Sequence, residues 1–137
     1  MSDANHSGIQ SLIKSLNSAY KNNACLWDND HNYSSFEWID FADADQSVVS
    51  FIRYDEARQD SLLCICNLTP ITRDHYNVGV PETGTWKVIL NTDSAEFNGS
   101  NYLKEKSFNT TLGNVQGREQ SITINLPPLS VIYLKKK

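Results

Sequence analysis

The segment 61–68 constrains the fold more than any other part of the chain. It reads Ser-Leu-Leu-Cys-Ile-Cys-Asn-Leu, so apolar side chains occupy both sets of alternating positions. Successive side chains of a β-strand point to opposite faces of a sheet, and a strand that is apolar on both faces is buried on both. One face carries Leu62, Cys64, Cys66 and Leu68, and the other carries Leu63 and Ile65. The segment is therefore predicted to be a central strand around which the other strands gather.

A partner strand for this segment lies directly before it in the sequence. Residues 47–54 read Ser-Val-Val-Ser-Phe-Ile-Arg-Tyr, a run of strand length that is rich in β-branched and aromatic residues. The residues between the two runs, 55–60, are polar or charged apart from one alanine. Two apolar runs joined by a short polar link predict a β-hairpin, whose connector we expect at the surface.

The rest of the chain alternates short apolar runs with turn residues. A proline early and a glycine late predict a turn at 81–84, and the Pro127-Pro128 pair predicts a sharp corner. Residues 95–117 are polar and are predicted to be mostly loop, with one short edge strand near 107–111. Further strands are predicted at 76–80, 86–90, 121–126 and 129–134. About seven or eight short strands predict an all-β fold, an antiparallel β-sandwich.

One amphipathic helix is predicted ahead of the strands, from about Gly8 to Asn22. Ser7 and Gln10 fit the capping-box pattern, in which a serine caps the helix and a glutamine follows three residues later. Large apolar side chains recur along one side of the helix and are called the apolar stripe below: Ile9, Leu12, Ile13, Leu16 and Tyr20. The predicted organisation has three parts: an N-terminal helix at 1–22, a connector at 23–46 that includes a short strand-like piece at 36–41, and a C-terminal β-sandwich at 47–137.

The composition fits one ordinary globular domain and argues against several functions. The chain has 137 residues, a net charge of −4 and a pI near 5.2, a balance that does not favour nucleic-acid binding. The basic run 135–137 is interpreted as a solvated tail. The sequence shows no signal peptide and no long apolar run, so we expect neither secretion nor a membrane span.

The three cysteines are interpreted as buried structural residues in a protein of the reducing cytoplasm. Cys64 and Cys66 lie two residues apart on one strand face, so a thiol pair and half of a metal site are alternatives. No Cys-x-x-Cys motif and no nearby pair of histidines accompanies them. A group of carboxylates lacks the spacing of a calcium loop and is interpreted as solvated or turn-capping: Glu37, Asp40, Asp43 and Asp45.

The sequence contains no recognisable catalytic motif. It lacks the Gly-x-Ser-x-Gly nucleophile turn, the P-loop, the His-Glu-x-x-His zinc motif and the dinucleotide-binding fingerprint. His31 and His75 are isolated in the sequence and are interpreted as surface residues. We therefore predict no catalytic residue, no metal ligand and no cofactor site within the chain.

Seven short segments carry a further signal. They lie, in order, at 9–20, 36–40, 47–53, 66–70, 76–81, 86–94 and 126–129. Two of them read Trp-Lys-Val-Ile-Leu-Asn-Thr-Asp-Ser and Leu-Pro-Pro-Leu. Together they resemble the C-terminal region of glycogen (1,4-α-glucan) branching enzymes, members of the α-amylase superfamily. Gln116-Gly117-Arg118 stands where that family tends to show His-Gly-Arg, which is a small departure.

The resemblance implies that the helix closes a catalytic (β/α)₈ barrel and that the β-sandwich follows this barrel. The catalytic carboxylates would lie in the barrel, before Ile9, so this chain alone is expected to be inactive and to need no cofactor. The whole enzyme would cut an α-1,4-glucan and rejoin the segment through an α-1,6 bond by a retaining mechanism. The implied partners are α-glucan of the glycogen type and the barrel, which would cover the apolar stripe.

Two roles are considered for the domain itself. In the first, which is structural, the sandwich covers and stabilises part of the barrel. In the second, long glucan chains stack on exposed aromatic rings, and the candidates are Trp27, Trp38, Trp86 and Tyr102. Each tryptophan can equally serve in packing, most clearly Trp86, which lies on an alternating apolar strand face. A stand-alone protein-interaction or carbohydrate-binding sandwich is the alternative. Without a barrel, the apolar stripe is expected to be an exposed patch.

Overall fold

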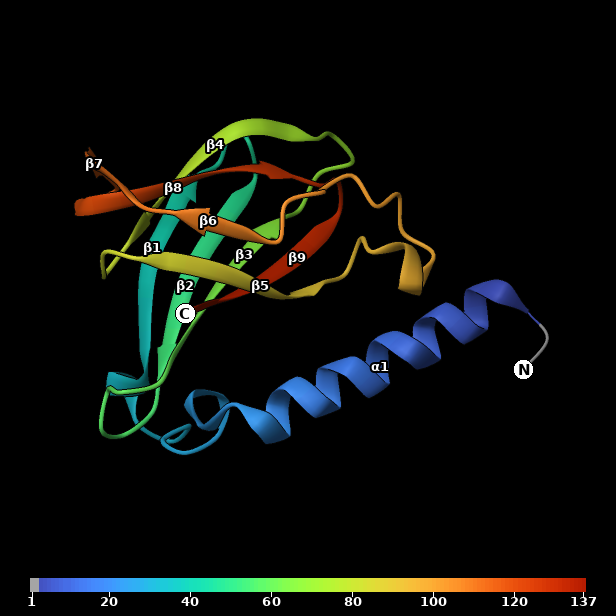
Figure 1. Cartoon of the computed structure of the whole chain (residues 1–137), viewed down its shortest axis with the longest axis horizontal. Helices are drawn as coiled ribbons and strands as arrows, with labels where there is room; N and C mark the ends of the chain where they lie inside the picture. The colour runs from blue at the N-terminus through green and yellow to red at the C-terminus, as the bar shows by residue number, and fades with distance from the viewer. Residues whose placement is uncertain (1–2) are drawn as a thin grey trace.

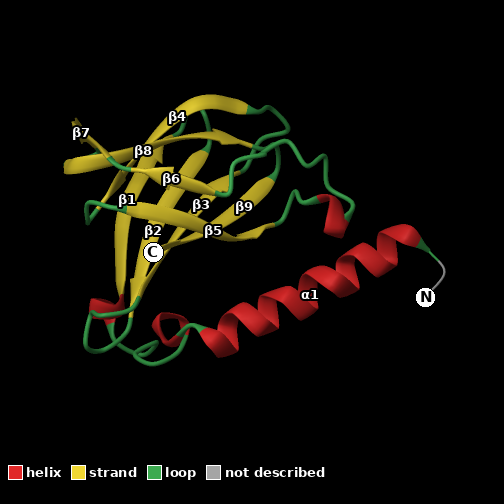
Figure 2. Cartoon of the chain, viewed as in Figure 1, coloured by secondary structure: helices red, strands yellow, loops and turns green. Residues whose placement is uncertain are grey.

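In the computed structural model, which describes residues 3–137, one α-helix precedes an all-β body (Figures 1 and 2). The helix α1 spans Ala4–Asn22, and three short 3₁₀ helices are η1 (Ala24–Leu26), η2 (Tyr33–Ser35) and η3 (Ala95–Phe97). The strands are β1 (Phe36–Asp43), β2 (Val48–Tyr54), β3 (Ser61–Asn67), β4 (Arg73–Val80), β5 (Thr85–Asn91), β6 (Ser107–Asn109), β7 (Thr111–Val115), β8 (Arg118–Leu126) and β9 (Ser130–Lys136).

The strands form two antiparallel sheets, which confirms the predicted sandwich. The first sheet has six strands in the order β1-β2-β3-β9-β5-β6, and the second has three in the order β4-β8-β7. Residues 95–117, predicted to be loop with one edge strand, supply two short strands that pair with different sheets. β6 pairs with β5, and β7 pairs with β8. Residues 3–137 therefore contain nine strands.

The central position predicted for β3 is confirmed. β3 pairs with β2 in the predicted hairpin and with β9 on its other side. Leu63 and Ile65 are fully buried in the main core between the two sheets. Leu62 and Cys64 point to the opposite face, where they pack in a second cluster with Cys25 of η1. Burial on both faces explains why the segment is apolar at every position from 62 to 66.

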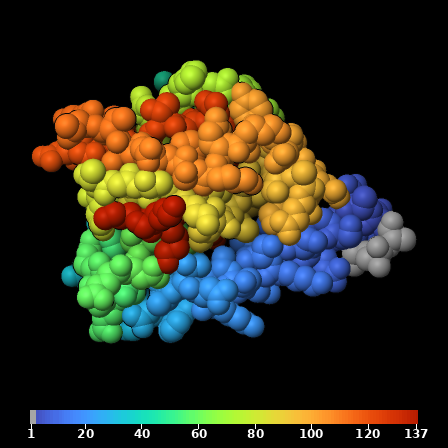
Figure 3. Space-filling model, in the orientation of Figure 1, coloured from blue at the N-terminus to red at the C-terminus, as the bar shows by residue number. Residues whose placement is uncertain are grey.

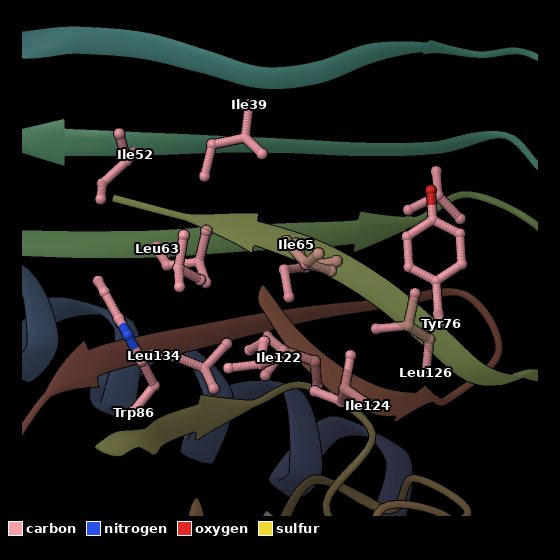
Figure 4. Packing of buried hydrophobic residues seen from close by; sticks show 14 of the residues in the cluster. Ile39, Ile52, Leu63, Ile65, Tyr76, Trp86, Ile122, Ile124, Leu126 and Leu134 are labelled. Atoms are coloured by element: carbon pink, nitrogen blue, oxygen red, sulfur yellow. The ribbon is translucent and has the colours of Figure 1, made fainter. Parts of the chain in front are cut away.

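The main core lies between the two sheets (Figure 4). Leu63 and Leu134 enter it from the six-stranded sheet, and Ile122 enters it from β8 of the other sheet. Trp86 is 0% exposed, and its indole N–H donates to the Glu82 carbonyl at 3.3 Å. The largest side chain of the core therefore keeps its one polar group satisfied.

The segment 23–46, predicted to be a connector with a strand-like piece at 36–41, contributes that piece to the sheet. Its second half forms β1, which pairs with β2 along the edge, so the six-stranded sheet begins at Phe36. Two register shifts interrupt this pairing, between Trp38 and Asp40 and between Asp40 and Asp43. Those shifts break the regular alternation of side chains by which a strand is recognised in a sequence.

α1 begins at Ala4, so the predicted start near Gly8 was wrong. The cap is Asp3, whose carboxylate accepts hydrogen bonds from two backbone N–H groups of the first turn at 2.8 and 3.2 Å. Ser7, the predicted cap, lies inside the helix and donates its hydroxyl to the Ala4 carbonyl at 2.9 Å. An aspartate caps a helix as well as a serine does, and here it adds one turn. The predicted end at Asn22 is confirmed.

The hairpin connector and the basic tail meet, which contradicts the prediction of a purely surface connector and a solvated tail. Asp60, the last connector residue, is half-buried and forms an ion pair with Lys135 of β9. Lys136 pairs with Glu82 at 2.6 Å. Only tertiary structure brings these charges together, because Asp60 and Lys135 are 75 residues apart in the chain.

Candidate functional site

The N-terminal half of α1 is held against the sandwich by a close contact at Gly8. A Cβ placed there would lie 2.9 Å from both the Phe97 carbonyl oxygen and the Asn98 amide nitrogen, so only glycine fits without a shift. The Asn98 side-chain amide also donates to the carbonyl of Ala4. This end of the helix is therefore fixed to η3, as seen in Figure 3, where the blue helix lies against the residues of that region.

The C-terminal end of α1 is fixed by a buried polar group around Asp60. Its carboxylate accepts hydrogen bonds from the Cys25 backbone N–H at 3.2 Å and from the Lys135 ammonium group. Lys135 donates in addition to the side-chain oxygen of Asn23, the residue that ends the helix, at 2.8 Å. Burial acts to raise the pKa of Asp60, but these hydrogen bonds outweigh it and hold the pKa below its usual value.

Between its two fixed ends α1 spans an open space, which we call the helix cleft. The cleft has a volume of about 450 Å³ and lies between the C-terminal half of α1 and the edge of β5. Ser15 and Ala19 face it from the helix, residues 88–91 from β5, and Asn101 and Glu105 from the following loop. It exists because β6 pairs only with residues 85–87, so the rest of β5 has no neighbouring strand on that side.

The loop beside the helix cleft is organised by Asp93, which sequence reasoning missed as a functional residue. Its carboxylate accepts hydrogen bonds from the Ser100 N–H and hydroxyl and from the Tyr102 N–H, at 2.7 to 3.0 Å. Gly99 passes so close that a Cβ there would lie 2.1 Å from the Asp93 carbonyl oxygen. The signal available in the sequence was an aspartate followed by a run of Ser, Gly and Asn, which is typical of side-chain-capped turns.

The apolar stripe is exposed over much of its length, and its C-terminal residues Leu16 and Tyr20 border the outer face of the six-stranded sheet. Ile9, Ile13 and Tyr20 are 57%, 52% and 51% exposed. Leu12 and Leu16 are half-buried, and Leu16 lines a groove with Leu26, Arg53 and Tyr133 on the outer face of the six-stranded sheet. The helix contacts the sandwich instead at Gly8, which lies against η3, and at Asn23, while the small residues Ser15 and Ala19 face the open helix cleft. The side chains with the most apolar area thus remain free for another surface.

A second exposed apolar region lies on β1, at the edge of the six-stranded sheet. The Phe36 ring stacks on Phe51 with centroids 5.0 Å apart and meets Trp38 edge-on at 4.9 Å. Trp38 contacts Phe41 at 5.5 Å between centroids, and these two side chains are 47% and 68% exposed. Trp38 is therefore open to solvent over about half of its surface and Phe41 over about two thirds.

The four predicted glucan-contacting aromatics lie in different environments. Trp86 is fully buried, so its ring has no open face on which a sugar could stack. Trp27 is 44% exposed and follows η1. Tyr102 is 37% exposed, and its hydroxyl donates to the Asp74 carboxylate. Among the residues that the structure describes, no ring contact joins Trp27, Trp86 or Tyr102 to Trp38.

Cys64 and Cys66 lie with their sulfur atoms 3.8 Å apart. Their shared hydrogen bond raises the pKa of the Cys64 thiol, as burial does, and lowers the pKa of Cys66. Cys25, which is completely buried, has its pKa raised to about 12 by burial and by the charge of Asp60. Within residues 3–137, no group of three or more His, Cys, Asp or Glu side chains is placed to hold a metal ion.

The carboxylates predicted to be solvated or turn-capping serve as caps and as ion-pair partners. Asp40 accepts a hydrogen bond from the Ala42 N–H at 2.9 Å. Asp43 accepts the Tyr76 hydroxyl at 2.6 Å, and burial together with this hydrogen bond raises the pKa of Tyr76. Gln116, where the family tends to show histidine, donates to Asp40 at 3.1 Å and accepts from the Gly79 N–H at 2.8 Å. It therefore links β1 to β4.

The fold and these surfaces define the class of the protein as a β-sandwich domain, whose described residues form a polar cleft beside α1 and expose apolar side chains on α1 and β1. No helix within residues 3–137 has both the length and the apolar character needed to cross a bilayer. The chain belongs to the family described as alpha amylase, C-terminal all-beta domain, which matches residues 38–137. This finding agrees with the resemblance identified in the sequence.

The similar curated proteins are branching enzymes. The chain is 43% identical over 130 residues to the 1,4-alpha-glucan branching enzyme GlgB of Aquifex aeolicus, covering 95% of this chain and 21% of that protein. It is 42% identical over 132 residues to GlgB of Prochlorococcus marinus (strain NATL1A), covering 96% of this chain and 18% of that protein. The chain thus spans about a fifth of the length of these relatives.

Among solved structures, the alpha-amylase from H. orenii is 20% identical and aligns with a TM-score of 0.41. That alignment covers 74% of this chain and 16% of the amylase.

Proposed function

We propose that this chain is the non-catalytic C-terminal β-domain of a 1,4-α-glucan branching enzyme and that it acts beside a catalytic barrel on the same polypeptide. The observation that carries the proposal is the identity of about 40% over 95% of the chain to proteins of that name. In such an enzyme, the α-1,6 branches of glycogen would be formed in the barrel. The three free thiols suit a cytoplasmic location.

The role proposed for the domain is to support the barrel through the apolar stripe. Ile9, Ile13 and Tyr20 lie on one helix side and are each about half exposed. Large apolar side chains on one face of a helix are typical of a surface that another structure covers. The same helix already contacts the sandwich at Gly8 and Asn23, so α1 would lie between the two bodies and join them.

The test supplies this chain to a truncated partner. The GlgB of Aquifex aeolicus is produced without the part that this chain matches, and the 137-residue chain is added to it. We expect the two to form a complex in size-exclusion chromatography and branching activity to rise, measured as loss of iodine–amylose colour. Ile13→Asp should abolish the complex, because it places a charge in the covered surface.

Lys14→Asp is the matched control, since Lys14 is the next residue, is exposed and receives the same aspartate. It should leave the complex intact. Equal binding by the Ile13 and Lys14 variants would contradict the role of the apolar stripe. Absence of any complex, together with a gene that encodes no barrel before Met1, would contradict the proposed function as a whole.

Contact with glucan at the β1 edge is a second candidate function. The observation that favours it is the pair of open rings, Trp38 and Phe41, with centroids 5.5 Å apart. Glucan contact at Trp27 and Tyr102 remains a prediction, because within residues 3–137 neither ring has a neighbouring ring that would extend the stacking surface. Native gels containing glycogen test this candidate: Trp38→Ala should restore the mobility that glycogen lowers, whereas Leu112→Ala, which truncates an exposed side chain of β7, should not. Mobility that glycogen does not change in any variant would contradict it.

A further inference from the structure

We propose that the helix cleft is a binding site for an uncharged sugar chain, and specifically for α-1,4-linked glucosyl units. The cleft is separate from the β1 edge and is formed by different elements, namely α1, β5 and the loop that follows η3. The general class of ligand, a neutral polyol, follows from the side chains that line the cleft. The choice of an α-glucan rests on the proposed function.

The cleft is held open by the way in which α1 is attached. The helix is fixed at its N-terminal end through Gly8 and Asn98 and at its C-terminal end through Asn23, while the stretch between these contacts presents the small side chains of Ser15 and Ala19. Side chains of this size do not fill the space left by the early end of β6. A site formed in this way exists before a ligand arrives, which lowers the ordering cost of binding.

The lining combines an apolar floor with polar groups that have hydrogen-bonding capacity left. Leu90 and Leu103 are 6% and 5% exposed and form part of the floor. Among the side-chain hydrogen bonds within residues 3–137, none involves the Ser15 hydroxyl, the Asn101 amide or the Glu105 carboxylate. Sugars present C–H faces and a rim of hydroxyl groups, so they need both kinds of surface in one place.

The charges around the cleft favour a neutral ligand over a charged one. Glu96, Glu105 and Lys106 contribute two negative charges and one positive charge, a net charge of −1. A phosphorylated sugar would need an excess of cationic donors, which this lining lacks. Carboxylates, in contrast, accept hydrogen bonds from neighbouring hydroxyl groups, and side-chain amides both accept from and donate to them. The volume of about 450 Å³ lies within the range of about 300–1,000 Å³ for small-molecule sites.

The experiment measures binding of maltohexaose to the 137-residue chain by isothermal titration calorimetry. Ser15→Leu places a larger side chain in the middle of the cleft, and we expect it to weaken binding at least tenfold. Lys21→Leu adds the same side chain to an exposed position of the same helix outside the cleft, and it should change the affinity less than twofold. Glu105→Gln keeps the shape but removes the charge, and it should weaken binding several-fold.

The outcomes separate this inference from the others. Binding that survives Ser15→Leu but is lost in Trp38→Ala would place the sugar on the β1 edge and overturn the cleft site. Absence of any maltohexaose binding would also overturn it, while complex formation with the truncated branching enzyme would still uphold the proposed function. Equal affinity for maltohexaose and cellohexaose would overturn the assignment to α-linked glucose. Far-ultraviolet circular dichroism confirms that Ser15→Leu is folded.

Discussion

Leu62 and Leu63 allow a direct test of burial on both faces of β3. The two residues are neighbours in the chain, both are 0% exposed, and they point to opposite faces of the six-stranded sheet. Replacing each in turn by alanine removes the same atoms from two different environments. If the outer face is packed as the structure shows, both substitutions should lower the free energy of unfolding substantially.

The two substitutions should lower the free energy of unfolding by different amounts, because Leu62 and Leu63 pack against different neighbours. A buried Leu→Ala change costs about 2–5 kcal/mol, and the cost is largest where the neighbours cannot close the cavity. Leu63 lies among side chains held by both sheets, so we expect about 3–5 kcal/mol. Leu62 packs against Cys25 on a three-residue 3₁₀ helix, a cover that can move inward, so we expect about 2–3 kcal/mol.

Urea unfolding, followed by tryptophan fluorescence, measures both values on the 137-residue chain. Leu112→Ala is the control, because Leu112 is 83% exposed and its truncation should cost less than about 0.5 kcal/mol. A Leu62→Ala variant as stable as this control, beside a Leu63→Ala variant that loses about 3 kcal/mol or more, would refute the reasoning. It would mean that η1 does not cover the outer face of the sheet.

Three further predictions concern the attachment of α1 and the thiols. Asp60→Asn should lower the free energy of unfolding by about 1–2 kcal/mol at neutral pH. The folded pKa of Asp60 is lowered, so the wild type should lose this extra stability as the pH falls below about 4. The urea unfolding curves of the two proteins should therefore converge in acid. Gly8→Ala would stabilise an ordinary helix interior, but here the new Cβ would lie 2.9 Å from atoms of Phe97 and Asn98. We expect it to loosen α1 and to raise the rate of amide hydrogen exchange in the helix. An unchanged exchange rate would contradict the close contact. Iodoacetamide should alkylate Cys66 before Cys64 and Cys25, because among the three thiols only that of Cys66 has a lowered pKa. Peptide mass spectrometry measures the order of labelling, and a Cys25 that reacts first would contradict it.

The strands could be predicted from the sequence because each is a local pattern. The apolar run of β3 and the turn residues around it suffice to place a buried strand and its hairpin partner. β1 was less clear, because its register shifts break the alternation and its outward residues are aromatic. The start of α1 was wrong for a related reason: Asp3 and Ser7 are both good caps, and no local pattern decides between them.

The candidate site could not be predicted, because it depends on contacts between distant parts of the chain. The pairing of Asp60 with Lys135 and the contact of Gly8 with Phe97 join residues that nothing local relates. The short reach of β6 along β5, which opens the helix cleft, is likewise a property of the sheet. Exposed aromatic residues can be recognised in a sequence, whereas a cleft lined by serine, asparagine and glutamate has no local sequence pattern.

The orientation of α1 connects the two proposals. A helix that served only the sandwich would turn its apolar stripe toward it, since burying one isoleucine completely contributes about 1.5–3 kcal/mol. Instead α1 contacts the sandwich at Gly8 and Asn23 and leaves Ile9 and Ile13 more than half exposed. This arrangement gives up stability in the isolated chain, and a covering barrel would recover it. Between those two contacts, Ser15 and Ala19 leave the helix cleft open, so a helix placed to join two bodies also forms one wall of a site between itself and the sandwich.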